Sequence, residues 1–331
     1  MPEETECEDV DRLLRETFTN EFRTGYINLK GFCLPAYYKK FANSIENFEV
    51  RDDDVWVCSF PKSGTTWTQE MVWCIANNLD FEAAKVVLSE RFPFFEHSAL
   101  FDYTTILSRM DGFQFPELVE QSVSYVDKLP SPRFIKSHLP FDLLPRQIRE
   151  GMKKPKIIYV ARNAKDTCIS YYNHCKLLEG YHGNFEDFCT LFLAGKLCFA
   201  PFWKHVLGFW TKRNNENVLF LKYEDMKEDL ASVIRETAHF LGKSKDGTYD
   251  NDEKMQPLLE HLSFESMKNN SAVNYEDVVD VNRKLKLIEA DGKFMRSGQK
   301  DQWKSQMAQE VIEKFDNFTR TNFHHTGLSF L

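Results

Sequence analysis

The sequence contains no run of about 20 apolar residues, so no membrane-spanning helix is expected. None of its eight cysteines forms a CxxC pair, which argues against a zinc ribbon or a thioredoxin-like redox site. Because several cysteines stand in apolar runs, we expect buried free thiols in a reducing compartment, the cytoplasm. Residues 1–4 are acidic and no apolar core follows them, so no secretory leader is expected.

Basic residues are also fewer than acidic residues. Lys and Arg number 42 against 50 Asp and Glu, which gives a formal net charge of −8. This balance disfavours nucleic acid or an anionic membrane as a partner. The basic residues are unevenly spread, however, because the segment 133–165 holds nine of them and only two acids. Such a segment is either a bounded site for an anion or a solvated basic face.

Internal repeats and low-complexity linkers are absent, and a hydrophobic content of 42% in 331 residues is ordinary for a globular chain. After a helical, aromatic-bearing lead-in over residues 1–50, short apolar runs alternate with helical patterns. The predicted strands are 55–60, 133–136, 156–160 and 217–222, and the predicted helices are 65–76, 164–178 and 225–241. This alternation predicts one α/β domain, residues 1–331, with a central and mostly parallel sheet flanked by helices.

Residues 100–132 do not fit this alternation of strands and helices. They carry a helical pattern flanked by Pro116 and Pro130. A long insertion beside a site often forms a lid over the ligand. A surface insertion with no role in the site would give the same pattern, so both interpretations stay open.

A turn rich in hydrogen-bond donors joins the first predicted strand to the helix after it. Its residues are Lys62, Ser63, Gly64, Thr65, Thr66 and Trp67. Free backbone N–H groups at a helix N-terminus bind anions, Gly64 permits close approach, and Lys62 adds a mobile charge. The turn is not the triphosphate motif GxxxxGK(S/T), because Lys62 precedes the glycine. The triplet Gly242-Lys243-Ser244 follows a helical stretch and is typical of a helix end.

Two further strand ends carry side chains suited to anions and protons. Lys136 and His138 alternate in the strand pattern and therefore share one face, directly before a Pro. Arg162 ends the next strand and can bind a phosphate through two N–H groups. The adjoining Lys165 and Asp166 are expected to form a surface pair. Carboxyl ends of parallel strands are where ligands of such sheets bind, so we expect one common site.

Together these motifs resemble those of the cytosolic sulfotransferases that use 3′-phosphoadenosine 5′-phosphosulfate (PAPS), and the long insertion resembles that of an insect member. The resemblance implies sulfuryl transfer to the hydroxyl of a small apolar acceptor, such as a phenol, steroid or other alcohol, without a metal. The donor leaves as adenosine 3′,5′-bisphosphate (PAP). The resemblance also implies roles for four side chains: His138 as base, Lys62 at the leaving oxygen, Lys136 at the sulfuryl oxygens and Ser170 restraining Lys62. An ordinary imidazole pKa of about 6.5 suits a base near neutral pH.

The resemblance extends through the C-terminal half in a weaker form. It implies that the nucleotide is contacted by Trp67, Arg162, Ser170, Tyr223, Ser263, Phe264, Arg296, Ser297 and Gly298. Leu262 stands where a Thr is usual, and Ser297 replaces a basic residue. The site for the 3′-phosphate therefore keeps Arg162 and Arg296 but lacks one cation.

Motif positions also suggest the acceptor pocket, for which the candidates are Phe94, Phe95, His174, Tyr275 and the aromatic residues of 32–38. His174 stands where many relatives carry an aromatic gate, and it is either a polar contact for the acceptor or an exposed bystander. Two alternatives to a transferase stay open. One is a lyase on the same scaffold, similar to an insect retinol dehydratase. The other is a non-catalytic binder of adenosine bisphosphate or apolar ligands, which the retention of both Lys62 and His138 disfavours.

The usual dimer segment of the family runs K…T-V…E. Here Lys304 and Glu313 stand at its ends, but Ala308 and Gln309 replace its apolar, branched centre. We therefore expect a monomer or a weak homodimer.

Overall fold

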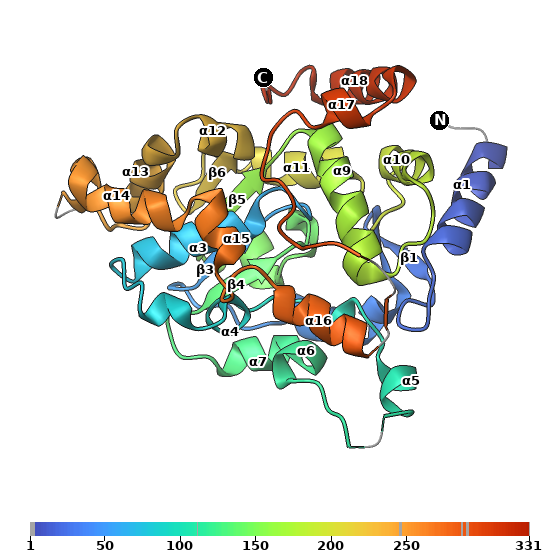
Figure 1. The fold of residues 1–331 in the computed structure, drawn as a ribbon, viewed down its shortest axis with the longest axis horizontal. Helices are drawn as coiled ribbons and strands as arrows, with labels where there is room; N and C mark the ends of the chain where they lie inside the picture. The colour runs from blue at the N-terminus through green and yellow to red at the C-terminus, as the bar shows by residue number, and fades with distance from the viewer. Residues whose placement is uncertain (1–3, 111, 245–246, 286, 289–290, 331) are drawn as a thin grey trace.

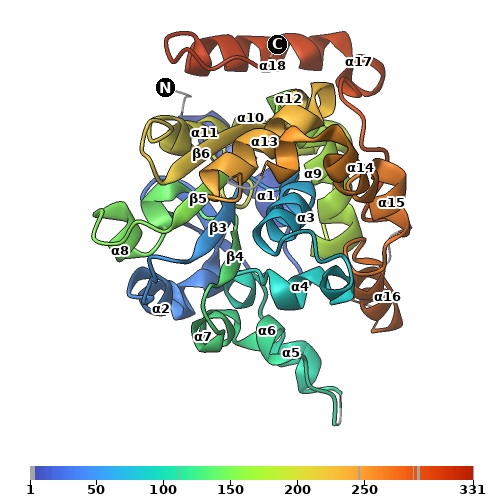
Figure 2. The same ribbon diagram turned by 90° about the vertical axis from the view of Figure 1, so that its left-hand side faces the viewer.

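The computed structural model describes residues 4–110, 112–244, 247–285, 287–288 and 291–330. A four-stranded parallel sheet lies at its centre, in the order β4-β3-β5-β6. Its strands are β3 (Val55–Cys58), β4 (Phe134–Ser137), β5 (Lys156–Ala161) and β6 (Val218–Lys222). Helices surround this sheet in both views (Figures 1 and 2). The predicted single α/β domain with a parallel sheet is confirmed.

The strands are short and apolar because both faces of the sheet are buried. Successive side chains of β3 enter different cores: Trp56 packs in one, and Val55 and Val57 pack in the other. In the parallel register, Val57 lies beside Lys136 on β4 and beside Ile158 on β5. This register brings the carboxyl ends of β3, β4 and β5 to one edge of the sheet.

Each core is completed by a different set of helices. The first core takes side chains from α1 (Glu4–Thr17), α9 (Ala164–His174), α10 (Phe185–Leu193), α11 (Phe202–Trp210) and α18 (Gln309–Phe323). The second takes side chains from α3 (Thr65–Ala76), α13 (Leu230–Phe240), α14 (Asp252–His261) and α15 (Phe264–Asn269). The sheet is therefore a buried middle layer, as its continuous apolar strands predict.

Two predicted helices differ from those observed. The helix predicted over 164–178 is α-helical only as far as His174 and continues as one wider π-helical turn, Cys175–Glu179. The helix predicted over 225–241 is two helices, α12 (Tyr223–Glu228) and α13. The break lies at Asp229, whose carboxylate accepts a hydrogen bond from the Ser232 N–H. A side-chain cap of this kind begins a new helix.

The lead-in over residues 1–50 is only partly helical, so that prediction is wrong for its middle. After α1 the chain forms an antiparallel hairpin of β1 (Tyr26–Leu29) and β2 (Phe32–Pro35). Gly31 allows the tight turn, since its φ is +80°, and β2 is buried throughout. Residues 1–3, on which the expectation of no secretory leader partly rests, lie outside the described residues.

The inserted segment 100–132 holds three short helices, α5 (Thr104–Leu107), α6 (Glu117–Glu120) and α7 (Ser122–Lys128). Hydrogen bonds anchor it at both ends. The Asp102 N–H donates to the Phe22 carbonyl at 2.8 Å, and the Ser122 hydroxyl donates to the Phe95 carbonyl at 2.7 Å. Between the anchors, α5 projects from the body of the molecule (Figure 2). Residue 111 of this segment lies outside the described residues.

The remaining elements are short. The other α-helices are α2 (Ala42–Glu46), α4 (Leu88–Arg91), α8 (Arg146–Arg149), α16 (Glu276–Lys284) and α17 (Trp303–Gln306), and 3₁₀ turns cover Ala36–Lys40, Ala83–Lys85, His97–Ala99, Phe141–Leu143 and Thr248–Asp250. Among the described residues, no helix combines the length and apolar character needed to cross a bilayer. The cysteines from Cys33 onward are buried free thiols, as predicted.

Candidate active site

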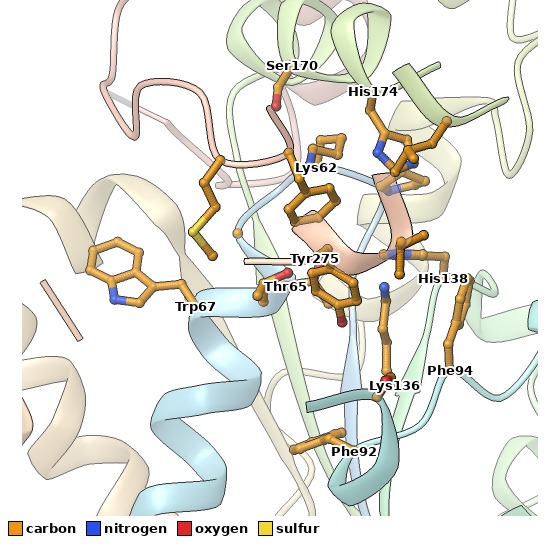
Figure 3. A pocket seen from close by; sticks show the side chains of 18 of the residues that line it. Lys62, Thr65, Trp67, Phe92, Phe94, Lys136, His138, Ser170, His174 and Tyr275 are labelled. Carbon is orange, nitrogen blue, oxygen red and sulfur yellow. The ribbon is translucent and has the colours of Figure 1, made fainter. Parts of the chain in front are cut away.

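A cavity of about 710 Å³ opens at the carboxyl ends of the central strands. Figure 3 shows side chains from α3, β4 and α9 converging on it. The predicted site residues that line it are Lys62, Gly64, Thr65, Thr66, Trp67, Phe94, Lys136, His138, Arg162, Ser170, His174, Tyr223, Ser263, Phe264, Tyr275, Arg296, Ser297 and Gly298. The structure thus gathers residues from motifs that are far apart in the sequence into one cavity.

Some predicted residues are not among the lining side chains: Phe95, Ser63 and the aromatic residues of 32–38, which pack in or against the core instead. Phe95 is fully buried and packs against Phe48 and Trp56, with ring centroids 4.8 and 5.1 Å apart. Strand-like alternation from Phe94 explains this, because adjacent side chains point to opposite faces. Ser63 is also fully buried, so its hydroxyl does not line the cavity as expected.

The turn after β3 is shaped for an anion. Lys62 and Gly64 both have positive φ, +67° and +106°, and a side chain at Gly64 would come within 2.8 Å of Tyr223. Only glycine fits there. Helix α3 begins at Thr65, so its first N–H groups face the cavity edge without helical partners. The Thr65 hydroxyl is fixed by the Ser59 hydroxyl at 2.6 Å.

Two lysines stand at the centre of the cavity (Figure 3). Burial, with the neighbouring Lys136 and Arg162, lowers the pKa of Lys62 to about 7. Burial also lowers the pKa of Lys136 to about 8. Aromatic rings contact both ammonium groups, with Lys62 Nζ 3.8 Å from the Phe294 ring centroid and Lys136 Nζ 4.4 Å from that of Phe94. A bound anion would favour the charged form of both lysines.

His138 is held in one tautomer. Its Nδ1 lies 2.8 Å from the Ser59 carbonyl oxygen, which can only accept, so Nδ1 carries the proton. Nε2 is left as an acceptor. Burial, reinforced by the charge of Lys136, lowers the pKa of His138 well below its ordinary value. The imidazole is therefore neutral at pH 7 and able to take a proton at Nε2.

Glu96 is a functional residue that the motifs did not reveal. Its carboxylate is fully buried and accepts hydrogen bonds from the His138 N–H at 2.5 Å and from the Ser137 hydroxyl at 2.9 Å. Burial raises its pKa to about 7. Glu96 therefore fixes the end of β4, where both Lys136 and His138 leave the strand. An acid directly after an apolar run was the only sign of it in the sequence.

A second set of buried polar groups forms hydrogen bonds that hold the backbone of His138. His205 Nε2 lies 2.8 Å from the His138 carbonyl oxygen, and its Nδ1 lies 2.9 Å from the Tyr159 hydroxyl. The carbonyl fixes Nε2 as the donor, so Nδ1 accepts from Tyr159. These groups come from α11 and β5, and no spacing in the sequence connects them to His138.

At the other end of the cavity lies an aromatic cleft suited to a flat ring. The Trp67 and Tyr223 rings are 5.7 Å apart, and the Tyr223 hydroxyl donates to the Gly298 carbonyl at 3.0 Å. A side chain at Gly298 would come within 2.3 Å of Phe264, so this backbone lies directly on that ring. Ser263 caps α15 by accepting from the Ser266 N–H.

Arg162 provides a buried cation beside this cleft. Its guanidinium lies 4.3 Å from the Tyr223 ring centroid and donates to the Gln299 carbonyl at 2.9 Å. Arg162 Nε and Ser297 Oγ are buried and have no partner among the described residues. Arg296 is exposed and donates to Gln302. Unsatisfied donors gathered on one cleft fit a phosphate there.

The expectation that Lys165 and Asp166 form a surface pair is wrong. Asp166 is buried and accepts from the N–H groups of Asp301 at 2.8 Å and Trp303 at 3.3 Å. Lys165 instead pairs with Asp316 at 2.5 Å. Adjacent residues on a helix point in different directions, which the sequence pattern alone could not resolve.

Fold and site together define an α/β protein whose cavity combines cationic side chains and an anion-binding turn with aromatic rings. The comparisons with known proteins agree. A family model described as the sulfotransferase domain matches residues 52–327. The chain belongs to this sulfotransferase family, and it is an enzyme of the PAPS-dependent sulfotransferase class.

Curated relatives match along most of the chain. It is 44% identical to luciferin sulfotransferase of Photinus pyralis, over 98% of this chain and 86% of that protein. It is 36% identical to Sulfotransferase 1E1 of Bos taurus, over 84% of this chain and 87% of that protein. The predicted resemblance to cytosolic sulfotransferases is confirmed.

Solved structures match equally well. Retinol dehydratase in complex with androsterone and PAP superposes with a TM-score of 0.85 at 34% identity, over 97% of this chain and 95% of that one. The complex with retinol and PAP gives a TM-score of 0.85 at 33% identity, over 98% and 96% of the two chains. Two structures with this fold thus hold PAP together with an apolar ligand.

Proposed function

We propose that this enzyme transfers a sulfuryl group from PAPS to the hydroxyl of a small apolar acceptor, with His138 as the base. The observation that carries the proposal is the position of His138. Its neutral imidazole lines the same cavity as Lys62, Lys136 and the anion-binding turn. A base, two cations and an apolar wall are what an in-line transfer to a hydroxyl requires.

The residues divide the chemistry between them. His138 Nε2 takes the acceptor's proton as the acceptor oxygen bonds to sulfur. Lys62 and the N–H groups of the turn receive the charge on the leaving phosphate oxygen as its bond to sulfur breaks. Lys136 faces the peripheral sulfuryl oxygens. We assign to Ser170, on α9, the restraint of Lys62 when no acceptor is bound, as the family resemblance implies. Preorganised charges of this kind lower the barrier without moving during the reaction.

The far end of the cavity is assigned to the nucleotide of the donor. Trp67, Tyr223 and Phe264 would hold the adenine ring, and Arg162 with Ser297 would bind the 3′-phosphate. Ser170, Ser263, Arg296 and the Gly298 backbone line the same end. The unpartnered Arg162 Nε and Ser297 Oγ support this fit. The backbone N–H of Ser63 is a candidate contact for the 5′-phosphate, although its side chain is buried.

The acceptor end is apolar. Phe94, Tyr275 and Phe199 line it, together with Phe101 and Phe115 from the inserted segment. We propose that segment 100–132 is a lid over the acceptor, since it is anchored at both ends and its rings line the cavity. Androsterone and retinol are bound in solved structures of the same fold. An alcohol or phenol of that size is therefore the proposed acceptor class.

A dehydratase is the second candidate, because the two solved structures with 33 and 34% identity are of retinol dehydratase. Enclosure by a lid does not itself cause elimination. Elimination needs a sulfate ester that ionises readily, and an allylic alcohol provides one. We therefore propose stable sulfates from phenols and steroids, and anhydro products only from allylic alcohols.

Mass spectrometry of the products tests both candidates. Purified enzyme is incubated with PAPS and, separately, a phenol, a steroid alcohol and retinol. Sulfated phenol and steroid are the expected products. If phenols give no sulfate while retinol is dehydrated, the transferase assignment is wrong and the dehydratase replaces it. If no acceptor reacts although PAP binds, the proposed acceptor class is wrong.

A further inference from the structure

His174 lines the cavity and is the last residue in a buried network of three side chains. Its Nε2 lies 3.2 Å from Glu179 Oε1, and Glu179 Oε2 accepts from Arg23 Nη1 at 2.5 Å. Arg23 is fully buried between the rings of Phe18 and Phe101, 5.0 Å from each centroid. Figure 3 shows the His174 side chain entering the cavity near Lys62 and His138. Arg23, more than 150 residues away in the sequence, thus helps to orient the imidazole through Glu179.

The contacts of Glu179 with Arg23 and His174 determine which nitrogen of His174 carries the proton. Although burial opposes its charge, Arg23 and His174 together lower the pKa of Glu179 to about 2, so its carboxylate is ionised and only accepts. Nε2 must therefore be the donor. Burial lowers the pKa of His174, so the ring is neutral. Nδ1 is then a hydrogen-bond acceptor, and it has no partner among the described residues.

A buried acceptor without a partner is costly unless a ligand satisfies it. We infer that His174 Nδ1 selects acceptors that carry a second hydrogen-bond donor, a hydroxyl or an N–H, besides the hydroxyl that is sulfated. This inference rests on the proposed transfer to a hydroxyl at His138. The geometry makes His174 a specificity-determining contact rather than an exposed bystander.

The same chain of contacts disfavours another class of acceptor. Glu179 lines the cavity beside His174 and is ionised. An acceptor with a carboxylate or sulfate at this position would face a like charge at low dielectric. A methyl ether or ketone at the same position offers only lone pairs to Nδ1 and leaves both acceptors unsatisfied. A neutral donor group is the chemistry that fits.

Matched phenols test this preference. Catechol, resorcinol and hydroquinone are each compared with their monomethyl ethers, which keep the oxygen and lose one donor. Catechol and its ether probe a donor next to the reacting hydroxyl, and the other pairs probe donors farther away. At least one diphenol should exceed its ether roughly fivefold in kcat/KM, the value of one neutral hydrogen bond, after division by two for its equivalent hydroxyls.

The matched variant is His174→Phe, which keeps a ring and removes the acceptor nitrogen. It should bring the diphenol-to-ether ratio, after division by two, back to about one, whatever its effect on the rate with the ether alone. A loss of activity shared equally by diphenol and ether would instead indicate a structural role and overturn the inference.

Binding to the PAP complex, measured by calorimetry, separates the inference from the proposed function. If no phenol is sulfated, the proposed function fails, and the binding preference for the diphenols still decides the inference. If the unmodified enzyme neither binds nor sulfates any diphenol better than its ether, the inference is wrong. This test on the unmodified enzyme needs no variant, so a misfolded variant does not affect it.

Discussion

Glu96 shows how a single buried side chain prepares this site. Its two oxygens receive the His138 N–H and the Ser137 hydroxyl, and Ser137 Oγ in turn accepts from the Leu139 N–H at 3.0 Å. These bonds fix the backbone where β4 ends. His138 and the neighbouring Lys136 are thereby positioned by a buried carboxyl group on another segment.

Glu96→Gln and Glu96→Ala should behave differently. Glutamine can keep most of this hydrogen bonding, whereas alanine leaves two buried groups unpaired, at about 1–3 kcal/mol each. We expect alanine to lower both the free energy of unfolding and kcat, and glutamine to retain most of both. Urea denaturation and steady-state rates measure this. Equal losses in both variants would remove hydrogen bonding as the reason for a carboxyl group here.

The raised pKa of Glu96 also predicts a pH dependence. Its folded pKa of about 7 exceeds the ordinary value of 4.5, so between these values the folded state binds more protons. The stabilising contribution is complete below pH 4.5 and is lost as the pH rises through 7. Relative to Glu96→Gln, the unmodified protein should lose stability between about pH 5 and 8. A constant difference across that range would contradict the shift.

His138→Asn should lower the rate of sulfuryl transfer by about 10²–10⁴-fold, the usual cost of losing a general base. Asparagine cannot accept the proton but keeps a polar side chain. PAP affinity should remain near that of the unmodified enzyme, because the nucleotide binds at the other end of the cavity. Single-turnover rates and PAP calorimetry provide the two measurements. An active variant would exclude His138 as the base.

At the scale of elements, the segment 298–303 closes the nucleotide end of the site. It is tied to α9 through Asp166, which accepts from the Asp301 and Trp303 N–H groups, and to the end of β5 through Arg162, which donates to the Gln299 carbonyl. The helix that carries Ser170 thus also holds the segment that lies on Phe264. Donor binding should depend on this link.

Asp166→Asn replaces one acceptor oxygen with an amide NH₂ that faces backbone donors. We expect PAP affinity to fall about tenfold, the value of roughly one hydrogen bond, while the acceptor end is unaffected. Asp316→Asn, which removes an exposed acid near the same helix, is the control and should leave PAP affinity unchanged. Calorimetry measures PAP affinity in the two variants. An equal fall in affinity would mean that net charge, and not the hydrogen bonds of Asp166 to segment 298–303, controls PAP binding.

The proposed lid can be tested with two phenylalanines that lie between α5 and α6. Phe115 lines the cavity, and Phe113 packs on it with centroids 5.0 Å apart without lining the cavity. Phe115→Ala should raise KM for a steroid acceptor by roughly tenfold, because a buried aromatic contact is worth about 1.5–3 kcal/mol. KM for PAPS should not change. Phe113→Ala should have a smaller effect, and a reversed order would contradict the lid assignment.

For the whole molecule, the C-terminal helices bear on oligomeric state. Lys304 pairs with Asp301 at 2.9 Å, and Glu313 accepts from Gln309 at 3.1 Å, so both charges are engaged within the chain. Ala308 and Gln309 are exposed between them. We predict a monomer by light scattering at micromolar concentration. A tight dimer that Glu313→Lys dissociates would show that this segment still forms the family's interface.

The sheet and the donor-rich turn after β3 follow from local patterns in the sequence. Short apolar runs predict strands wherever both faces of a sheet are buried, and the turn at Lys62 and Gly64 is local, because its positive φ values and free N–H groups arise within a few residues. His138, Arg162 and Tyr223 each follow a strand, and parallel strands bring their carboxyl ends together. These features can be predicted because they arise from residues that are close together in the sequence or at the ends of parallel strands.

Tertiary structure alone decided the groups that support those residues. Glu96, His205 and Asp166 act through buried hydrogen bonds to partners on other elements, and no periodicity connects the members of such a pair. Similarly, Phe95 turned into the core while its neighbour Phe94 faced the cavity. Burial and hydrogen-bond partners depend on which elements meet in space, and only the folded chain fixes that.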